Sequence, residues 1–176
     1  MKRIFTIILV LMFFCGNVNA AQISAQSAVL IDADNRRVLF EKNSTQKMGM
    51  ASTTKIMTAI LAIEKCDVND VVTVSYNASI TEGSSMYLKS GEQVTVYELL
   101  CGLLLSSGND AAIAIAEHIS GSCEEFAKLM TARAKELGAY LTSFENPNGL
   151  DGQNHYTTAQ DLACITSYAM TLPLFA

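Results

Sequence analysis

Apolar residues recur along this chain at two different spacings, and the spacing changes after the first part of the sequence. The apolar runs at 27–32 and 37–41 are short, and turn-forming residues lie between them at 34–36. This arrangement predicts an antiparallel β-hairpin. A third short run, rich in valine, predicts another strand at 71–74.

Most of the remaining apolar residues recur every three or four positions, which is the spacing of one helix face. The segments 96–105 and 111–119 are apolar nearly throughout and predict buried helices. The predicted helices cover 53–65, 96–105, 111–119, 123–137 and 158–172. The whole pattern predicts an α+β fold in which a hairpin precedes a largely helical region.

The predicted strands are too few to form a stable sheet of their own. A hairpin of two strands is marginal in isolation and normally joins a larger sheet. No strand is predicted after the helix at 158–172, because the sequence stops at Ala176. We therefore expect the sequence to be the front part of a larger domain whose later sheet strands are missing.

The first 20 residues have the pattern of a signal peptide. Lys2 and Arg3 form a positively charged start, an apolar run follows at 4–15, and small residues precede the predicted cleavage point. The apolar run is shorter than the roughly 20 residues of a membrane-spanning helix. We expect residues 1–20 to be removed and residues 21–176 to form the exported domain, in the periplasm or at the outer face of the cytoplasmic membrane. An uncleaved N-terminal anchor is the alternative.

The composition argues against nucleic acid as a partner and gives no sign of a metal or redox site. The 176 residues are 50% hydrophobic and 16% charged with a net charge of −5, which suits a packed core. Because the chain is acidic and has no basic cluster, nucleic acid is not an expected partner. The cysteines after the predicted signal peptide, Cys66, Cys101, Cys123 and Cys164, match no zinc or redox spacing. Export permits disulfides without requiring them, so their pairing stays open, and no metal or cofactor is predicted.

Ser52 and Lys55 are the first candidates for catalysis. In the motif Ser52-Thr-Thr-Lys55 the two side chains lie one turn apart on the same helix face. A lysine whose pKa is lowered can take the hydroxyl proton as serine attacks a carbonyl, and N–H groups at the helix start favour an oxyanion. The alternative is that Ser52 only caps the helix. A second copy, Ser44-Thr-Gln-Lys47, has no helical pattern after it and is the weaker candidate.

A second candidate, Ser107-Gly-Asn109, lies in the short connection between two apolar helices. The helices would hold its polar groups rigidly, although ordinary turn and cap residues would give the same pattern. The similar triad Ser75-Tyr-Asn77 follows a strand and lacks this buried frame, so it ranks lower. His118 and His155 have structural explanations, the first at a helix end and the second in a loop.

Together these motifs resemble the serine-type D-alanyl-D-alanine carboxypeptidases, which are low-molecular-mass penicillin-binding proteins. The similar segments are 25–40, 50–58, 82–92, 104–112, 146–151 and 155–163. The resemblance implies a β-lactamase/transpeptidase-like fold and an exported enzyme that removes the terminal D-Ala from peptidoglycan stem pentapeptides. It also implies acylation by β-lactams and no cofactor, and a full-length form could attach peripherally to the membrane.

The resemblance assigns a role to each candidate residue. Ser52 would be the nucleophile and its N–H an oxyanion donor, while Lys55 would be the general base and share its proton through Ser107. Asn109 would orient Lys55 and bind the substrate backbone. The family's third motif, Lys-Thr-Gly, does not occur in the 176 residues. We therefore expect this chain to release little or no D-Ala. The alternatives to a carboxypeptidase are a β-lactamase or D,D-endopeptidase, or a non-catalytic remnant or binding module, which the absent Lys-Thr-Gly would explain.

Overall fold

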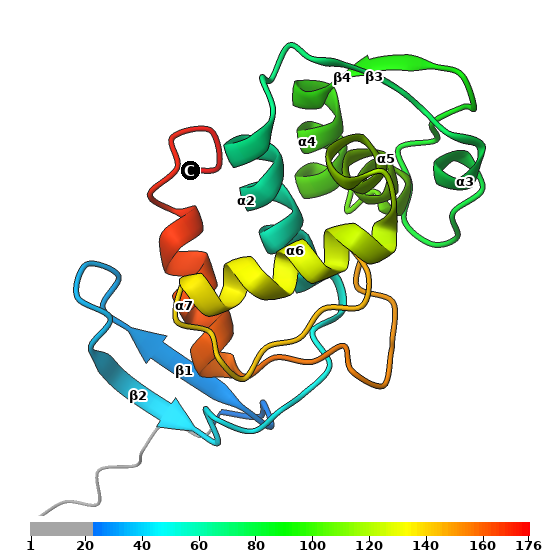
Figure 1. Ribbon diagram of the computed structural model, residues 1–176. Coiled ribbons are helices and arrows are strands. Elements are labelled where there is room, and N and C mark those ends of the chain that lie inside the picture. The colour runs from blue at the N-terminus through cyan, green and yellow to red at the C-terminus, as the bar shows by residue number, and fades with distance from the viewer. Residues whose placement is uncertain (1–22) are drawn as a thin grey trace, which may run out of the picture.

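The computed structural model describes residues 23–176, and the predicted signal peptide lies outside the described residues. Helices form the body of the molecule, with the first hairpin beside α7 and a smaller strand pair at the opposite side (Figure 1). In chain order the elements are β1 (Ala28–Ile31), β2 (Val38–Lys42), the 3₁₀ turn η1 (Ala51–Thr54), α2 (Lys55–Lys65), β3 (Val71–Thr73), α3 (Tyr76–Ser79), β4 (Gln93–Thr95), α4 (Val96–Leu105), α5 (Asn109–Ser120), α6 (Cys123–Glu136) and α7 (Ala159–Ala169). The predicted α+β class is confirmed.

The predicted N-terminal hairpin is present. Strands β1 and β2 pair antiparallel, with Leu30 opposite Phe40. The turn between them is closed by Asp32, whose carboxylate accepts a hydrogen bond from the Asp34 N–H. One face of the hairpin packs on α7, while Leu30 and Phe40 remain exposed. The hairpin therefore presents apolar residues to solvent.

The second strand pair was only half predicted. The strand expected at 71–74 is β3, and it pairs antiparallel with β4 through the central match of Val72 with Val94. Strand β4 was missed because its three residues lie directly before a helix and are too few to show alternation. The single-turn helix α3 was missed because its four residues are too few to show a helical period.

Helix α2 is the central element, because it packs against α4, α5, α6 and α7. Its inward face is completely buried at Ile60 and Leu61, which fixes the helix within the core. The far end of α2 is held by Glu64, which accepts two hydrogen bonds from Arg133 on α6 and one from the Tyr168 hydroxyl on α7. A helix anchored on all these neighbours gives the residues at its start a rigid support.

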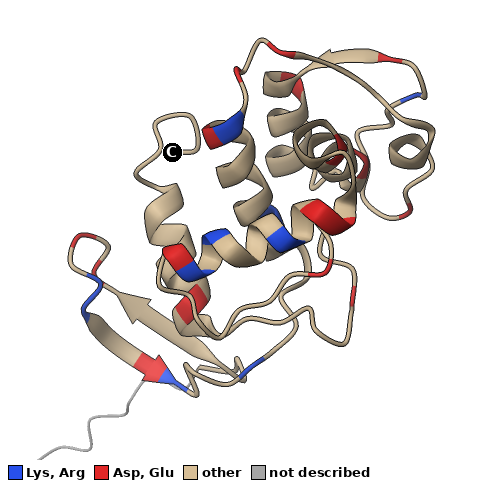
Figure 2. Ribbon diagram, in the orientation of Figure 1, with Lys and Arg blue, Asp and Glu red and all other residues tan. Residues whose placement is uncertain are grey.

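The charged residues are distributed over the helices and connecting segments, with acidic and basic side chains intermingled (Figure 2). Among the described residues, none of the helices combines the length and the apolar character needed to cross a membrane.

Candidate active site

The turn before α2 brings Ser52 and Lys55 together. Ser52 lies within η1 and Lys55 is the first residue of α2, and the Lys55 Nζ donates a hydrogen bond of 3.3 Å to the Ser52 Oγ. The residues in cap position are Met50 for η1 and Thr54 for α2, and neither side chain makes a capping hydrogen bond. Ser52 is therefore not a helix cap, and its hydroxyl is directed to Lys55 instead.

Lys55 is almost entirely enclosed, with 3% of its surface exposed. Its Nζ donates to the Asn109 Oδ1 and to the Asn148 carbonyl, both at 2.8 Å. Burial lowers the pKa of the Lys55 amine, because the charged form loses hydration. When the amine is neutral, its two N–H bonds can stay on Asn109 and Asn148, which leaves the lone pair for the Ser52 hydroxyl.

Ser107 and Asn109 reach this pair from the connection between α4 and α5. The Ser107 Oγ donates to the Ser52 Oγ at 3.1 Å, and Ser107 adopts a left-handed conformation with φ of 54°. A non-glycine residue in this region stores backbone strain, which is common at functional sites. Asn109 is buried and its Nδ2 donates to the Glu82 carbonyl at 2.7 Å. The structure thus brings together all four predicted site residues.

The loop from 145 to 158 is a part of the site that sequence reasoning missed. Besides the contact of Asn148 with Lys55, the Pro147 carbonyl accepts a 2.6 Å hydrogen bond from Thr58 on α2. Both contacts use main-chain oxygens, which every residue type carries. No side-chain pattern in the sequence could therefore have revealed them. The loop fixes the first turns of α2 and the position of the lysine amine.

His155 connects the same loop to η1, the turn that carries Ser52. Its Nδ1 accepts a hydrogen bond from the Glu145 N–H at 3.0 Å, so its Nε2 carries the proton and donates to the Thr54 Oγ1 at 2.8 Å. Burial lowers the pKa of the imidazole, which favours this neutral form. These contacts agree with the structural role expected for His155, since both ring nitrogens are occupied within the loop and the turn.

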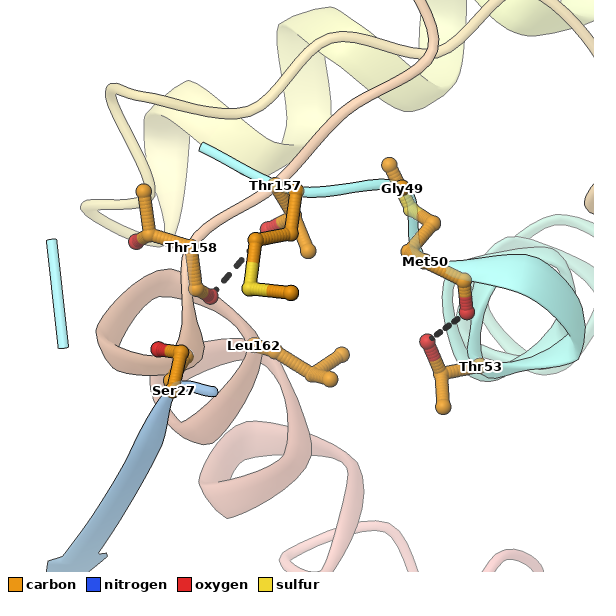
Figure 3. A pocket seen from close by; sticks show the side chains of 9 residues that line it. Ser27, Gly49, Met50, Thr53, Thr157, Thr158 and Leu162 are labelled. Carbon is orange, nitrogen blue, oxygen red and sulfur yellow. Dashed lines mark hydrogen bonds between the residues drawn. The ribbon is translucent and has the colours of Figure 1, made fainter. Parts of the chain in front are cut away.

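Two cavities border η1, the turn that carries Ser52. The first, about 350 Å³, is lined by Ser52, Lys55 and Ser107 together with apolar residues of α2 and α4. The second, about 210 Å³, lies between Met50 and Thr53 on one side and Thr157 and Leu162 on the other (Figure 3). Only the first cavity exposes both the candidate nucleophile and the candidate base, so it is the candidate substrate site.

The competing motif copies have structural partners. Ser44 is buried and donates to a Glu41 carboxylate oxygen at 2.6 Å, while the Lys47 Nζ lies 4.1 Å from the centre of the Tyr156 ring. Ser75 caps α3, and Asn77 donates to Glu117. The lower rank that the sequence analysis gave to both copies agrees with these contacts.

Gly149 determines how closely the 145–158 loop approaches η1, the turn that carries Ser52. Its φ is +94°, and a Cβ added there would lie 2.0 Å from the Ala51 carbonyl oxygen. We expect Gly149→Ala to push the loop and the turn apart and to slow acylation of Ser52 about 100-fold, which is the scale for a 1 Å misplacement. The measurement is the rate of covalent labelling by a fluorescent penicillin.

Gly121→Ala is the matched control for that experiment. Gly121 also has a positive φ, 75°, but a Cβ there would meet nothing within 4 Å. Both variants carry the left-handed backbone cost of roughly 1–2 kcal/mol, whereas only Gly149→Ala creates the collision. Equal labelling rates for the two variants would contradict the role given to Gly149.

The site defines the class of protein. A serine hydroxyl beside a buried lysine amine, with a second serine hydroxyl in contact, is the arrangement of enzymes that transfer acyl groups through a serine–lysine pair. The chain belongs to the D-alanyl-D-alanine carboxypeptidase family, peptidase S11, whose model matches residues 16–174.

Individual relatives agree with this assignment. The chain is 49% identical over 144 residues to the D-alanyl-D-alanine carboxypeptidase DacF of Bacillus subtilis, covering 79% of this chain and 37% of the relative. It is 40% identical over 159 residues to DacC of Escherichia coli, covering 84% of this chain and 40% of the relative. The chain thus spans about 40% of the length of these relatives.

A solved structure shows the same fold. The D-alanyl-D-alanine carboxypeptidase of Mycobacterium tuberculosis superposes with a TM-score of 0.86 at 35% identity, over 92% of this chain and 62% of that chain. The predicted family and the predicted transpeptidase-like fold are therefore both confirmed.

Proposed function

We propose that the protein is an exported serine D-alanyl-D-alanine carboxypeptidase that removes the terminal D-Ala from peptidoglycan stem pentapeptides. The family assignment supports this reaction class. The observation that carries the proposal is the environment of Lys55. The side chain is buried, and its amine contacts Ser52, Asn109 and Asn148 in a way that suits a neutral amine acting as general base for Ser52.

In the acylation step the Ser52 Oγ attacks the carbonyl of the penultimate D-Ala. The Lys55 Nζ accepts the Ser52 proton, and we assign to Ser107, whose Oγ contacts the Ser52 Oγ, the transfer of a proton from Lys55 to the leaving amine of the terminal D-Ala. The C–N bond breaks, the free D-Ala departs, and an ester on Ser52 remains. Water then hydrolyses this ester with Lys55 again accepting a proton.

Rigid support explains why these side chains are suited to the reaction. Asn109 and Asn148 hold the amine from two directions, so little reorganisation is needed when the proton moves. The N–H of Ser52 lies in the 3₁₀ turn that precedes α2, where free N–H groups carry partial positive charge. We assign this N–H as one donor to the oxyanion.

The same chemistry should acylate Ser52 with β-lactams, whose strained amide presents a carbonyl to the same nucleophile. Slow hydrolysis of that ester would distinguish a carboxypeptidase from a β-lactamase. The 176 residues hold the serine–lysine and Ser-Gly-Asn motifs but no Lys-Thr-Gly. This observation favours, as a second candidate, a chain that binds stem peptides and releases little or no D-Ala.

The test is to map the covalent adduct on the unmodified chain. The purified protein is incubated with penicillin, or with a diacetyl-Lys-D-Ala-D-Ala peptide, and the modified residue of the protein is located by mass spectrometry. The D-Ala released from the substrate peptide is measured in the same reaction. We expect the adduct on Ser52, and none from a control peptide ending in L-Ala. An adduct on another residue, or no adduct at all, would overturn the proposed acylation.

A further inference from the structure

Three side chains able to bind a metal meet at the end of α2 that lies away from the active site. Cys66 follows the last residue of α2, Asp70 precedes β3, and His118 lies in the last turn of α5. The thiol sulfur, a carboxylate oxygen and an imidazole nitrogen all lie within 4.8 Å of one another. We call these residues the α2-end cluster.

The cluster is separate from the catalytic residues. Cys66 lies 11 positions after Lys55, which corresponds to about 16 Å along a helix. The chain passes from this end of α2 through a short acidic connection into β3 (Figures 1 and 2). A ligand bound there would not touch Ser52 or Lys55.

The backbone fixes the cluster, and its side chains leave ligand atoms free. The Asp70 N–H donates to the Asp67 carbonyl and the Asp70 carbonyl accepts from the Val96 N–H, both at 3.0 Å. One Asp70 carboxylate oxygen accepts from the Asp67 N–H at 2.9 Å, which leaves the other oxygen available. Within residues 23–176 no hydrogen bond involves the Cys66 sulfur or the His118 ring.

The distances and the ligand types fit a tetrahedral zinc ion. Zinc bonds of about 2.0–2.3 Å to oxygen, nitrogen and sulfur place neighbouring ligand atoms about 3.3–3.8 Å apart. Small side-chain rotations would bring the three atoms of the cluster from within 4.8 Å to that spacing. Thiolate and imidazole prefer zinc over magnesium or calcium, which bind oxygen ligands.

The charge of the cluster also matches a divalent cation. Burial and the Asp70 carboxylate raise the pKa of the free Cys66 thiol, so a metal ion binding there would release its proton. The bound ligand set of thiolate, carboxylate and neutral imidazole then carries two negative charges. Asp70 and His118 are exposed and Cys66 is half-buried, so an ion can reach all three from solvent. The exposed side leaves the fourth coordination position to water.

We propose that Cys66, Asp70 and His118 bind one zinc ion, with water as the fourth ligand. The ion joins the end of α2, the start of β3 and the end of α5. The sequence alone predicts no metal site, because spacing rules detect ligands that are close in sequence. Here His118 lies 48 positions beyond Asp70, and only the fold brings it to the others.

The first test measures metal binding by the purified chain. Equilibrium dialysis against zinc chloride is expected to give one ion per chain. Cobalt(II) in its place should produce tetrahedral visible bands and a thiolate charge-transfer band. Zinc at about 100 times its Kd should raise Tm by about 5–10 °C, because the ion binds only the folded chain. No stoichiometric binding by the unmodified chain would overturn the proposal.

Single substitutions then test the ligands Cys66 and His118. Cys66→Ser and His118→Gln are each expected to raise the zinc Kd about 100-fold or more. With cobalt(II) in place of zinc, Cys66→Ser should also lose the thiolate charge-transfer band, whereas this loss is not required of His118→Gln. The matched controls are Cys101→Ser, a half-buried thiol on α4, and Asp34→Asn, an exposed carboxylate in the turn between β1 and β2.

Both controls should bind zinc as the unmodified chain does. His118→Gln alters an exposed side chain and should fold normally, so it decides the outcome if Cys66→Ser does not fold. Unchanged zinc affinity in His118→Gln, or isolation of Cys66 in a disulfide, would contradict the site.

Discussion

Chains carrying Ser52→Ala are expected to form no covalent adduct with a fluorescent penicillin, whereas Ser44→Ala chains should be labelled at the unmodified rate. Both serines begin the same four-residue pattern, Ser-x-x-Lys, eight positions apart. Only Ser52 has its hydroxyl within reach of a buried lysine amine and lines the candidate substrate cavity. Removing the attacking oxygen should lower the acylation rate about 10⁶-fold, the scale for loss of a serine nucleophile.

The Ser44 control separates chemistry from stability. Ser44→Ala removes a buried hydroxyl that donates to Glu41, which should cost about 1 kcal/mol of folding free energy. Labelling is therefore measured at a temperature where circular dichroism shows both variants to be folded. Persistent labelling of Ser52→Ala, or its loss in Ser44→Ala, would contradict the assignment of the nucleophile.

Replacing Lys55 with arginine is expected to slow acylation about 10³-fold or more. Arginine keeps the positive charge and the donors, but it cannot lose a proton at accessible pH and so cannot act as a base. Lys47→Arg is the matched control, because Lys47 belongs to the second copy of the motif and lies over the Tyr156 ring. This variant should react at the unmodified rate.

The pH dependence provides an independent readout for Lys55. Only the neutral amine can accept the Ser52 proton, so the acylation rate should rise with pH and level off above the Lys55 pKa. Burial lowers this pKa from 10.5, so the plateau should begin below that value. The rising limb should be absent in Lys55→Arg. A limb that survives in that variant would show that another group is the base.

Local features of the site could be predicted from the sequence, and distant ones only in part. The Ser52–Lys55 pair is visible because three positions make one helical turn. Ser107 and Asn109 lie more than 50 positions from Ser52. Their place between two apolar helices makes them candidates, but only the resemblance to a family links them to Ser52 and gives them roles. The hydrophobic pattern predicts the hairpin and the helices, whereas the β-lactamase/transpeptidase-like fold was predicted only from the same resemblance.

The rest of the site depends on contacts without a sequence pattern. The carbonyls of Pro147 and Asn148 are main-chain groups, so residue identity says nothing about their role. The interpretation of Ser52 as a cap could not be rejected from the sequence, since Ser is common at that position. It fails in the structure because a 3₁₀ turn precedes α2 and moves the start of the helix to Lys55.

The three acceptors around the Lys55 amine lie in segments that are far apart along the chain: Ser52, Asn109 and Asn148. A nascent chain that has emerged only as far as α6 already contains the nucleophile, the base and Asn109. The carbonyl of Asn148 arrives later, and it needs the 145–158 loop to dock on α2. Reactivity toward penicillin should therefore appear late in folding, after the helices have formed, and the rate at which it appears would report docking of this loop.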